Sequence, residues 1–134
     1  MKFPDFSAVQ VRVARPTDQL NEVVKFYEQG FGLKRLAEFS GHDGYDGVIL
    51  GIPDVQYHLE FTQHIEGSPC PAPTTDNLLV FYMPDGNKVD KIADRLRRMG
   101  YGEVEPENGY WKEKGKTIED PDGWRIVLMN TEGI

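Results

Sequence analysis

The sequence predicts a single α+β domain in which one unit, made of a strand, a helix and several further strands, occurs twice. The first helix candidate opens at Asp18-Gln19-Leu20 and stops at Gly30-Phe31-Gly32-Leu33. The second opens at Pro84-Asp85-Gly86 and stops at Met99-Gly100-Tyr101-Gly102. An apolar-rich strand candidate precedes each helix, and more strand candidates follow it. This repeat predicts a cleft between two half-sheets, with the function located where the two copies face each other.

The bulk composition fits one globular domain and argues against several classes of function. The 134-residue chain is 39% hydrophobic and 28% charged, so it can bury a sizeable core without disulfides. Its formal net charge of -7 disfavours binding to nucleic-acid phosphates. The one cysteine, Cys70, stands among prolines and is interpreted as an incidental thiol, and no segment reaches the ~20 apolar residues of a membrane span. We therefore expect a cytoplasmic protein that binds neither nucleic acid nor membranes.

The first unit, about residues 7–66, begins with a strictly alternating segment. Valines occupy one face of residues 9–13, while Gln10 and Arg12 lie on the other face, which predicts a half-buried strand. Pro16 ends this strand, and apolar residues at helical spacing follow it. Turn residues then separate three further strands, predicted at residues 33–39, 47–50 and 56–62.

The second unit, about residues 76–134, repeats this order after a proline-rich connector at about residues 67–75. A nearly all-apolar stretch predicts a strand at residues 77–83. The helix that follows has one apolar face, formed by Val89, Ile92, Ala93, Leu96 and Met99. The last strands are predicted at residues 101–104, 116–119 and 124–129, and the turn Asp120-Pro121-Asp122-Gly123 joins the final two.

Two segments carry a family resemblance: Phe26-Tyr27-Glu28-Gln29-Gly30-Phe31-Gly32-Leu33 and Glu119-Asp120-Pro121-Asp122-Gly123-Trp124-Arg125-Ile126. They resemble structural signatures of the vicinal-oxygen-chelate superfamily, which contains glyoxalase I, extradiol dioxygenases, fosfomycin-resistance proteins and bleomycin-resistance proteins. The resemblance covers almost the whole chain and implies two βαβββ modules that form a half-open barrel with a central cleft. It also implies a homodimer, because paired modules of this superfamily often come from two chains. Neither segment is catalytic, so both support the fold more than the function.

Enzymes of this superfamily hold a divalent metal in the cleft with His or Glu side chains from the first and last strands of each module. The resemblance places these positions at Arg12 or Val11, at Glu60, at Leu78 or Leu79, and at Val127. Arginine and aliphatic side chains cannot ligate a metal, so only Glu60 matches, with His58 on the same strand face. We therefore expect no bound cofactor. The alternative is one divalent metal with His58 and Glu60 among its ligands.

Without a metal, the predicted cleft presents four polar side chains, Gln10, Arg12, His58 and Glu60. Two interpretations of this set stay open. In the first, Arg12 and Glu60 form an ion pair that replaces the metal and supports the barrel. In the second, Arg12 binds an anionic or carbonyl group of a ligand, and the other three complete the polar lining.

An aromatic pair supplies the second set of candidate ligand-binding residues. Tyr110 and Trp111 follow the turn signal Glu107-Asn108-Gly109, so we expect them on a loop. A loop position leaves these rings exposed unless they cover something. They are candidates either for a lid over a ligand or for a contact with a second subunit.

These observations predict a small-molecule-binding protein of the glyoxalase and bleomycin-resistance type that lacks the usual metal site. The expected ligand is aromatic or anionic, and the expected partner is a second copy of the chain. One alternative is a metal-dependent lyase or dioxygenase of the same superfamily, which is the reaction class expected if the protein is an enzyme. Another is a structural homodimer with a vestigial cleft.

Overall fold

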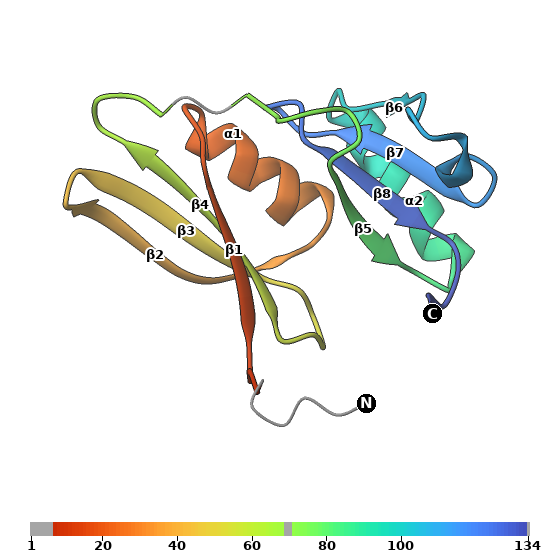
Figure 1. Ribbon diagram of the computed structural model, residues 1–134, viewed down its shortest axis with the longest axis horizontal. Helices are drawn as coiled ribbons and strands as arrows, with labels where there is room; N and C mark the ends of the chain where they lie inside the picture. Colours follow the sequence, from red (N-terminus) through yellow and green to blue (C-terminus); the bar gives the residue numbers. More distant parts are fainter. Residues whose placement is uncertain (1–6, 69–70, 134) are drawn as a thin grey trace.

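The computed structural model describes residues 7–68 and 71–133, and Cys70 lies outside this part of the chain. Two four-stranded sheets make up the framework (Figure 1). The first sheet has the order β1 (Val11–Pro16), β4 (Tyr57–His64), β3 (Tyr45–Gly51) and β2 (Lys34–His42). The second has the order β5 (Leu78–Tyr82), β8 (Arg125–Met129), β7 (Gly115–Glu119) and β6 (Glu103–Val104).

The two sheets share one topology. In each, the first strand pairs in parallel with the last strand, and the remaining pairs are antiparallel. A helix connects the first and second strands of each module, so each module is a βαβββ unit. The predicted fold class is therefore confirmed, and the described strands form two separate sheets that do not close into a barrel.

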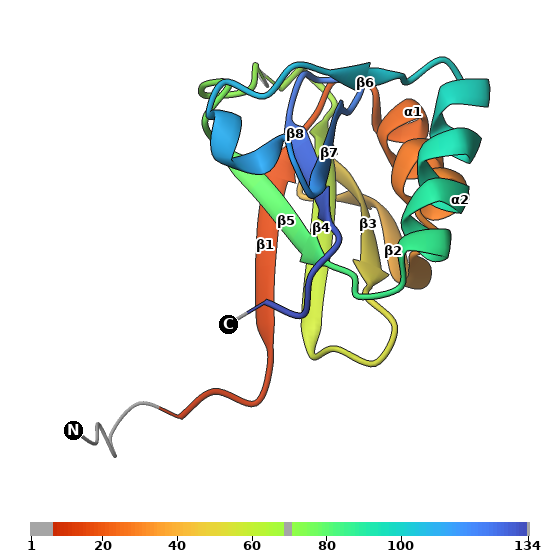
Figure 2. The same cartoon turned by 90° about the vertical axis from the view of Figure 1, so that its right-hand side faces the viewer.

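The helices cover one face of each sheet. α1 (Leu20–Lys25) continues into the π-helical turn η1 (Phe26–Gly30), and α2 (Gly86–Arg98) begins at the cap Asp85, whose side chain accepts a 2.9 Å hydrogen bond from Asn87 N. The two helices lie on the same side of the molecule in Figure 2. Gly30 allows a close approach, because a Cβ there would lie 2.3 Å from Leu96 Cδ2. The C-terminal ends of the two helices can therefore pack together.

A single hydrophobic core joins the two modules. Its completely buried members come from α1, η1, β3, α2 and β8: Val23, Phe26, Leu50, Leu96, Ile126 and Leu128. Aromatic contacts strengthen this core. The Phe26 ring lies edge-on to Tyr101 at 4.9 Å, and Tyr27 stacks on Phe61 at 4.9 Å.

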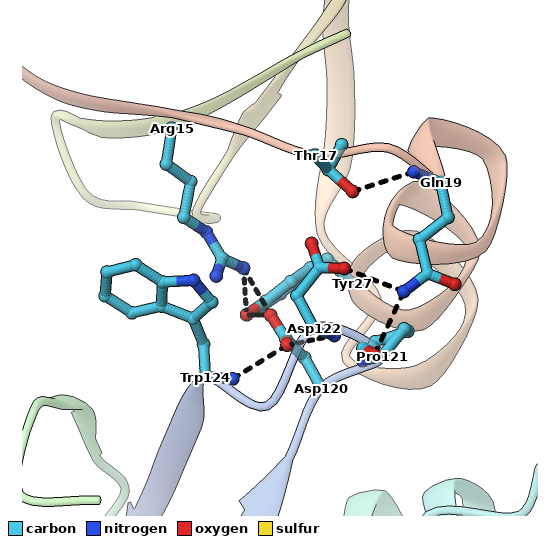
Figure 3. Close-up of polar contacts among 8 residues, drawn as sticks. All are labelled: Arg15, Thr17, Gln19, Tyr27, Asp120, Pro121, Asp122 and Trp124. Atoms are coloured by element: carbon cyan, nitrogen blue, oxygen red, sulfur yellow. Dashed lines mark hydrogen bonds and ion pairs between the residues drawn. The ribbon is translucent and has the colours of Figure 1, made fainter. Parts of the chain in front are cut away.

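A buried polar cluster, the Arg15–Tyr27–Asp120 cluster, also connects the modules (Figure 3). The Tyr27 hydroxyl donates to Asp120 Oδ2 at 2.7 Å, and Arg15 Nη2 donates both to Tyr27 Oη at 2.9 Å and to the same carboxylate oxygen. The other oxygen, Oδ1, accepts the backbone N–H groups of Asp122 and Trp124. The Asp120 side chain is completely buried, and the Arg15 guanidinium lies over the Trp124 ring at 4.6 Å. This cluster fixes the final hairpin against the first module.

The cluster predicts that the free energy of unfolding falls at high pH. Burial raises the pKa of the Tyr27 phenol well above its ordinary value, and the Asp120 carboxylate raises it further. Because the folded pKa exceeds the unfolded pKa of about 10, the stabilisation is complete below pH ~10 and is lost as the pH rises through the folded pKa. In urea unfolding at a series of pH values, we expect a steeper loss above pH ~10 for wild type than for Tyr27→Phe. Tyr110→Phe serves as the control, since Tyr110 is exposed, and equal slopes for wild type and Tyr27→Phe would contradict this expectation.

The main departure from the sequence expectation concerns the first strand. It spans Val11–Pro16 instead of residues 9–13, and Val11 and Val13 remain 50% and 46% exposed. The prediction of a half-buried strand is wrong for these valines, which lie on the outermost strand of the first sheet and are too exposed to belong to the core. The ends of the other strands lie within three residues of the expected ranges. Among the described residues, no helix is both long and apolar enough to span a membrane.

Candidate functional site

The candidate site lies on the face of the first sheet that points away from the helices. Leu59 and Phe61 of β4 are buried in the core, so the alternating residues His58 and Glu60 lie on the opposite face. Parallel pairing of β1 with β4 places Arg12 beside His58 and thus on the same face. We call the set Gln10, Arg12, His58 and Glu60 the polar face.

The structure joins these four predicted residues in two pairs. Arg12 Nη1 donates to Glu60 Oε1 at 3.4 Å, and the side chains of Arg12 and Glu60 are 40% and 17% exposed. Gln10 Nε2 and His58 Nδ1 lie 2.9 Å apart. The Gln10 amide nitrogen can only donate, so His58 Nδ1 is the acceptor of this bond. The ion pair of the first interpretation is therefore present in the structure.

The ion pair leaves most of the Arg12 guanidinium available. An arginine has five N–H groups, and in the described part of the chain Glu60 is the one side chain that accepts from Arg12. The exposed remainder can bind a carboxylate, phosphate or carbonyl oxygen in a fixed fork geometry. The two interpretations are thus compatible, because Glu60 orients the guanidinium while its outer edge faces solvent.

The residues at the metal-ligand positions do not fit a metal. Within residues 7–68 and 71–133, no three His, Cys, Asp or Glu side chains come together as a metal-binding group. Glu60 accepts from a permanent cation, and His58 Nδ1 accepts from Gln10. On the second sheet Val127 is completely buried and has no donor atom. A divalent ion needs three or four ligands, whereas Glu60 and the neighbouring His58 offer only two, and each of them already has a hydrogen-bond partner.

The corresponding face of the second sheet is covered by the chain itself. Residues 105–114, here named the η2 segment, cross this face and contain the short helix η2 (Gly109–Trp111). A Cβ on Gly115 would lie 2.3 Å from Trp111 O and 3.2 Å from Val127 Cγ1, so the segment and Val127 share one face. In Figure 2, η2 lies on the opposite side of the sheet from α2. Arg125 Nη1 fastens the segment by donating to Glu105 O at 2.9 Å.

Tyr110 and Trp111 therefore occupy a different place from the polar face of their own chain. Both lie on η2, where their rings meet edge-on at 5.0 Å. Tyr110 is 69% exposed, and Trp111 is partly buried. Figure 1 shows this short helix beyond β7, well apart from β1. The structure does not bring them together with Arg12 in one chain.

Sequence reasoning missed the Arg15–Tyr27–Asp120 cluster. Arg15 continues the apolar face of β1 that begins with Val11 and Val13, and an arginine on such a face is the signal for a buried ionic partner. The sequence pattern identified Asp120 only as a residue of the turn before the last strand. Its role as the partner depends on a contact across 105 residues of chain.

These features define a class of protein before any single relative is considered. Two βαβββ modules, each with its first strand parallel to its last, are the fold of the vicinal-oxygen-chelate superfamily. Glyoxalase I of Leishmania major matches with a TM-score of 0.71 at 20% identity, covering 92% of this chain and 87% of that one. TnmS3, an antibiotic-binding protein of Streptomyces sp. CB03234, matches with a TM-score of 0.66 at 23% identity, covering 93% and 96%.

The chain belongs to the YycE-like family. Residues 11–62 match the YycE-like N-terminal domain, and residues 76–130 match the YycE-like C-terminal domain. The YycE protein of Bacillus subtilis (strain 168) is 57% identical over 133 residues, which is 99% of this chain and 96% of that protein. The crystal structure of a Bacillus subtilis YycE protein of unknown function matches with a TM-score of 0.93, covering 100% of this chain and 98% of that one.

Proposed function

We propose that the protein binds a small organic molecule at the polar face of the first sheet, without a metal ion, and works as a homodimer. The half-exposed Arg12 guanidinium carries this proposal, because a permanent cation stands where a metal ligand would be expected. The ligand class follows from that charge. A carboxylate, phosphonate or polarised carbonyl would bind Arg12, and an aromatic body would add apolar contacts.

Two further observations support binding over metal-dependent catalysis. The donor set at the four ligand positions consists of one carboxylate, which is paired with Arg12, together with apolar or cationic side chains. TnmS3, which shares the fold, is by its name an antibiotic-binding protein. Superfamily members that pair their modules between two chains support the homodimer.

The proposal predicts opposite effects for the two members of the ion pair. We expect Arg12→Ala to weaken binding of an anionic ligand by roughly 10-fold or more, because a hydrogen bond to a charged group contributes about 1.5–3 kcal/mol. Glu60→Gln removes the competing carboxylate and should maintain or strengthen that binding. Both substitutions should change the free energy of unfolding by less than about 1 kcal/mol, since the pair is partly exposed.

The measurement is a thermal-shift and calorimetric screen of aromatic carboxylates, fosfomycin and bleomycin, run with and without divalent metals. Arg98→Ala is the matched control, because it removes an exposed arginine from the end of α2. Binding by wild type that Arg12→Ala leaves unchanged would contradict the proposal. Stoichiometric zinc, nickel, manganese or iron in protein purified without chelator would favour the metal-dependent lyase or dioxygenase instead.

A further inference from the structure

The hydrophobic core opens to the surface in an apolar groove of about 720 Å3 between the modules. The strand β5 and the turn that joins β3 to β4 flank this groove (Figure 1). Six of its lining side chains pack against the buried core but are themselves only partly buried: Ile52, Tyr57, Leu79, Phe81, Met83 and Ile92. The groove is therefore a hollow in the core, which gives an apolar molecule walls on more than one side.

This groove is distinct from the polar face. Tyr57 and His58 are neighbours on β4, so their side chains point to opposite faces of the first sheet. Tyr57 lines the groove, and none of the four polar-face residues is among the described residues that line it. Phe31 and Leu33, which follow η1 and belong to the core, line it from the inside. A molecule in the groove would therefore occupy a second site on the protein.

The charge of the groove favours an anion. The chain has a formal net charge of -7, yet no Asp or Glu is among the described residues that line the groove. Lys88 is the one charged side chain in this lining, and it makes no ion pair within the described part of the chain. It lies four residues before Ile92 and thus on the same face of α2. A free cation therefore stands beside an apolar wall, to which Tyr57 and Tyr82 add hydroxyl donors.

We propose that the groove binds a carboxylate with an aliphatic body, of the size of a medium-chain acyl group. The aliphatic body fills the hollow beside Leu79 and Phe81, and the carboxylate pairs with Lys88. The volume of the groove lies within the range of roughly 300–1,000 Å3 that is typical of small-molecule sites. The inference does not rest on the ligand proposed for Arg12, because the two sites share no residue.

A second protein surface is the competing occupant, and the shape of the groove favours the small molecule. An aliphatic chain can enter a hollow that reaches the core residues Phe31 and Leu33. A flat protein surface would cover the groove without filling it, and the side chains at the bottom would then lack contacts on one side.

The test is a calorimetric titration with hexanoate, octanoate and decanoate. We expect one site per chain, with an affinity that rises at least about twofold for each added methylene group. Lys88→Gln should weaken octanoate binding at least about fivefold and change the binding of octanol, which has no charge, less than about twofold. Lys91→Gln is the matched control, because Lys91 is an exposed lysine of the same helix outside the groove lining. It should change octanoate binding less than about twofold.

A second variant tests the groove from its other wall. Val55 is 54% exposed in the turn between β3 and β4, so Val55→Glu should repel octanoate and weaken its binding at least about fivefold, while circular dichroism checks the fold. Equal effects of Lys88→Gln and Lys91→Gln would overturn the inference, as would loss of octanoate binding in Arg12→Ala, which would place the anion on the polar face. Absent binding, or binding that weakens as the protein concentration rises, would show that another copy occupies the groove and would also overturn it. Octanoate binding by a protein without an Arg12-dependent ligand would reject the polar-face proposal alone.

Discussion

Replacing Asp120 with asparagine is expected to lower the free energy of unfolding by about 3–5 kcal/mol, which lowers the melting temperature by roughly 10–20 °C. The completely buried carboxylate accepts from Arg15 and Tyr27 through one oxygen and from two backbone N–H groups through the other. Asparagine keeps one oxygen for the hairpin but leaves the Arg15 guanidinium, only 12% exposed, without its counter-charge. An uncompensated buried charge is the costly outcome. Calorimetric melting and urea unfolding measure the change.

A control at a surface ion pair and a double-mutant cycle test whether the lost Arg15–Asp120 ion pair causes the destabilisation. Asp94→Asn removes a carboxylate that pairs with Arg97 at 3.0 Å, where both side chains are at least half exposed, and it should cost less than about 1 kcal/mol. Combining Asp120→Asn with Arg15→Met should recover part of the loss, because the unpaired cation is also removed. If the double variant were as unstable as the sum of the single variants, the ion pair would not be the source of the effect.

Local sequence patterns predicted where the helices and strands lie in the chain, but they did not predict which strands lie next to one another in a sheet. Helical spacing and the glycine stop located the first helix, although its last turn, Phe26–Gly30, is π-helical. The alternation of residues 9–13 identified a strand, but strand alternation cannot say whether a strand lies at a sheet's centre or edge. That position depends on pairing between Val11 and Tyr57, which lie 46 residues apart in the sequence.

The candidate site was predicted in part for the same reason. Spacing placed Arg12 with Gln10 and His58 with Glu60 on single strand faces, and the parallel register of β1 and β4 then brought the two faces together. Tyr110 and Trp111 were correctly placed on a turn-like segment. The burial of Val127 beneath that segment carries no local signal, because a valine in a strand core and a valine under a loop give the same pattern.

We expect the substitution Gly115→Ala to destabilise the protein by displacing the η2 segment. An added Cβ would lie 2.3 Å from the main-chain oxygen of Trp111 and 3.1 Å from Met129 Sδ. A backbone atom cannot rotate away as a side-chain tip can, so Gly115→Ala must displace the η2 segment from the second sheet. We expect a loss of about 1–3 kcal/mol in the free energy of unfolding. A red shift of tryptophan emission should accompany this loss, because Trp111 becomes more exposed. Fluorescence-monitored urea unfolding measures both quantities.

Gly109→Ala provides the control within the same segment. A Cβ at that position would have no heavy atom within 4 Å, so this substitution should leave the emission maximum unchanged. Exposing the face around Val127 would also create an apolar surface beneath the displaced segment, and binding of a hydrophobic dye should rise in Gly115→Ala alone. If both alanine variants had wild-type emission and stability, the η2 segment would tolerate the added methyl group. Its contact with the second sheet would then be too loose to seal the face around Val127.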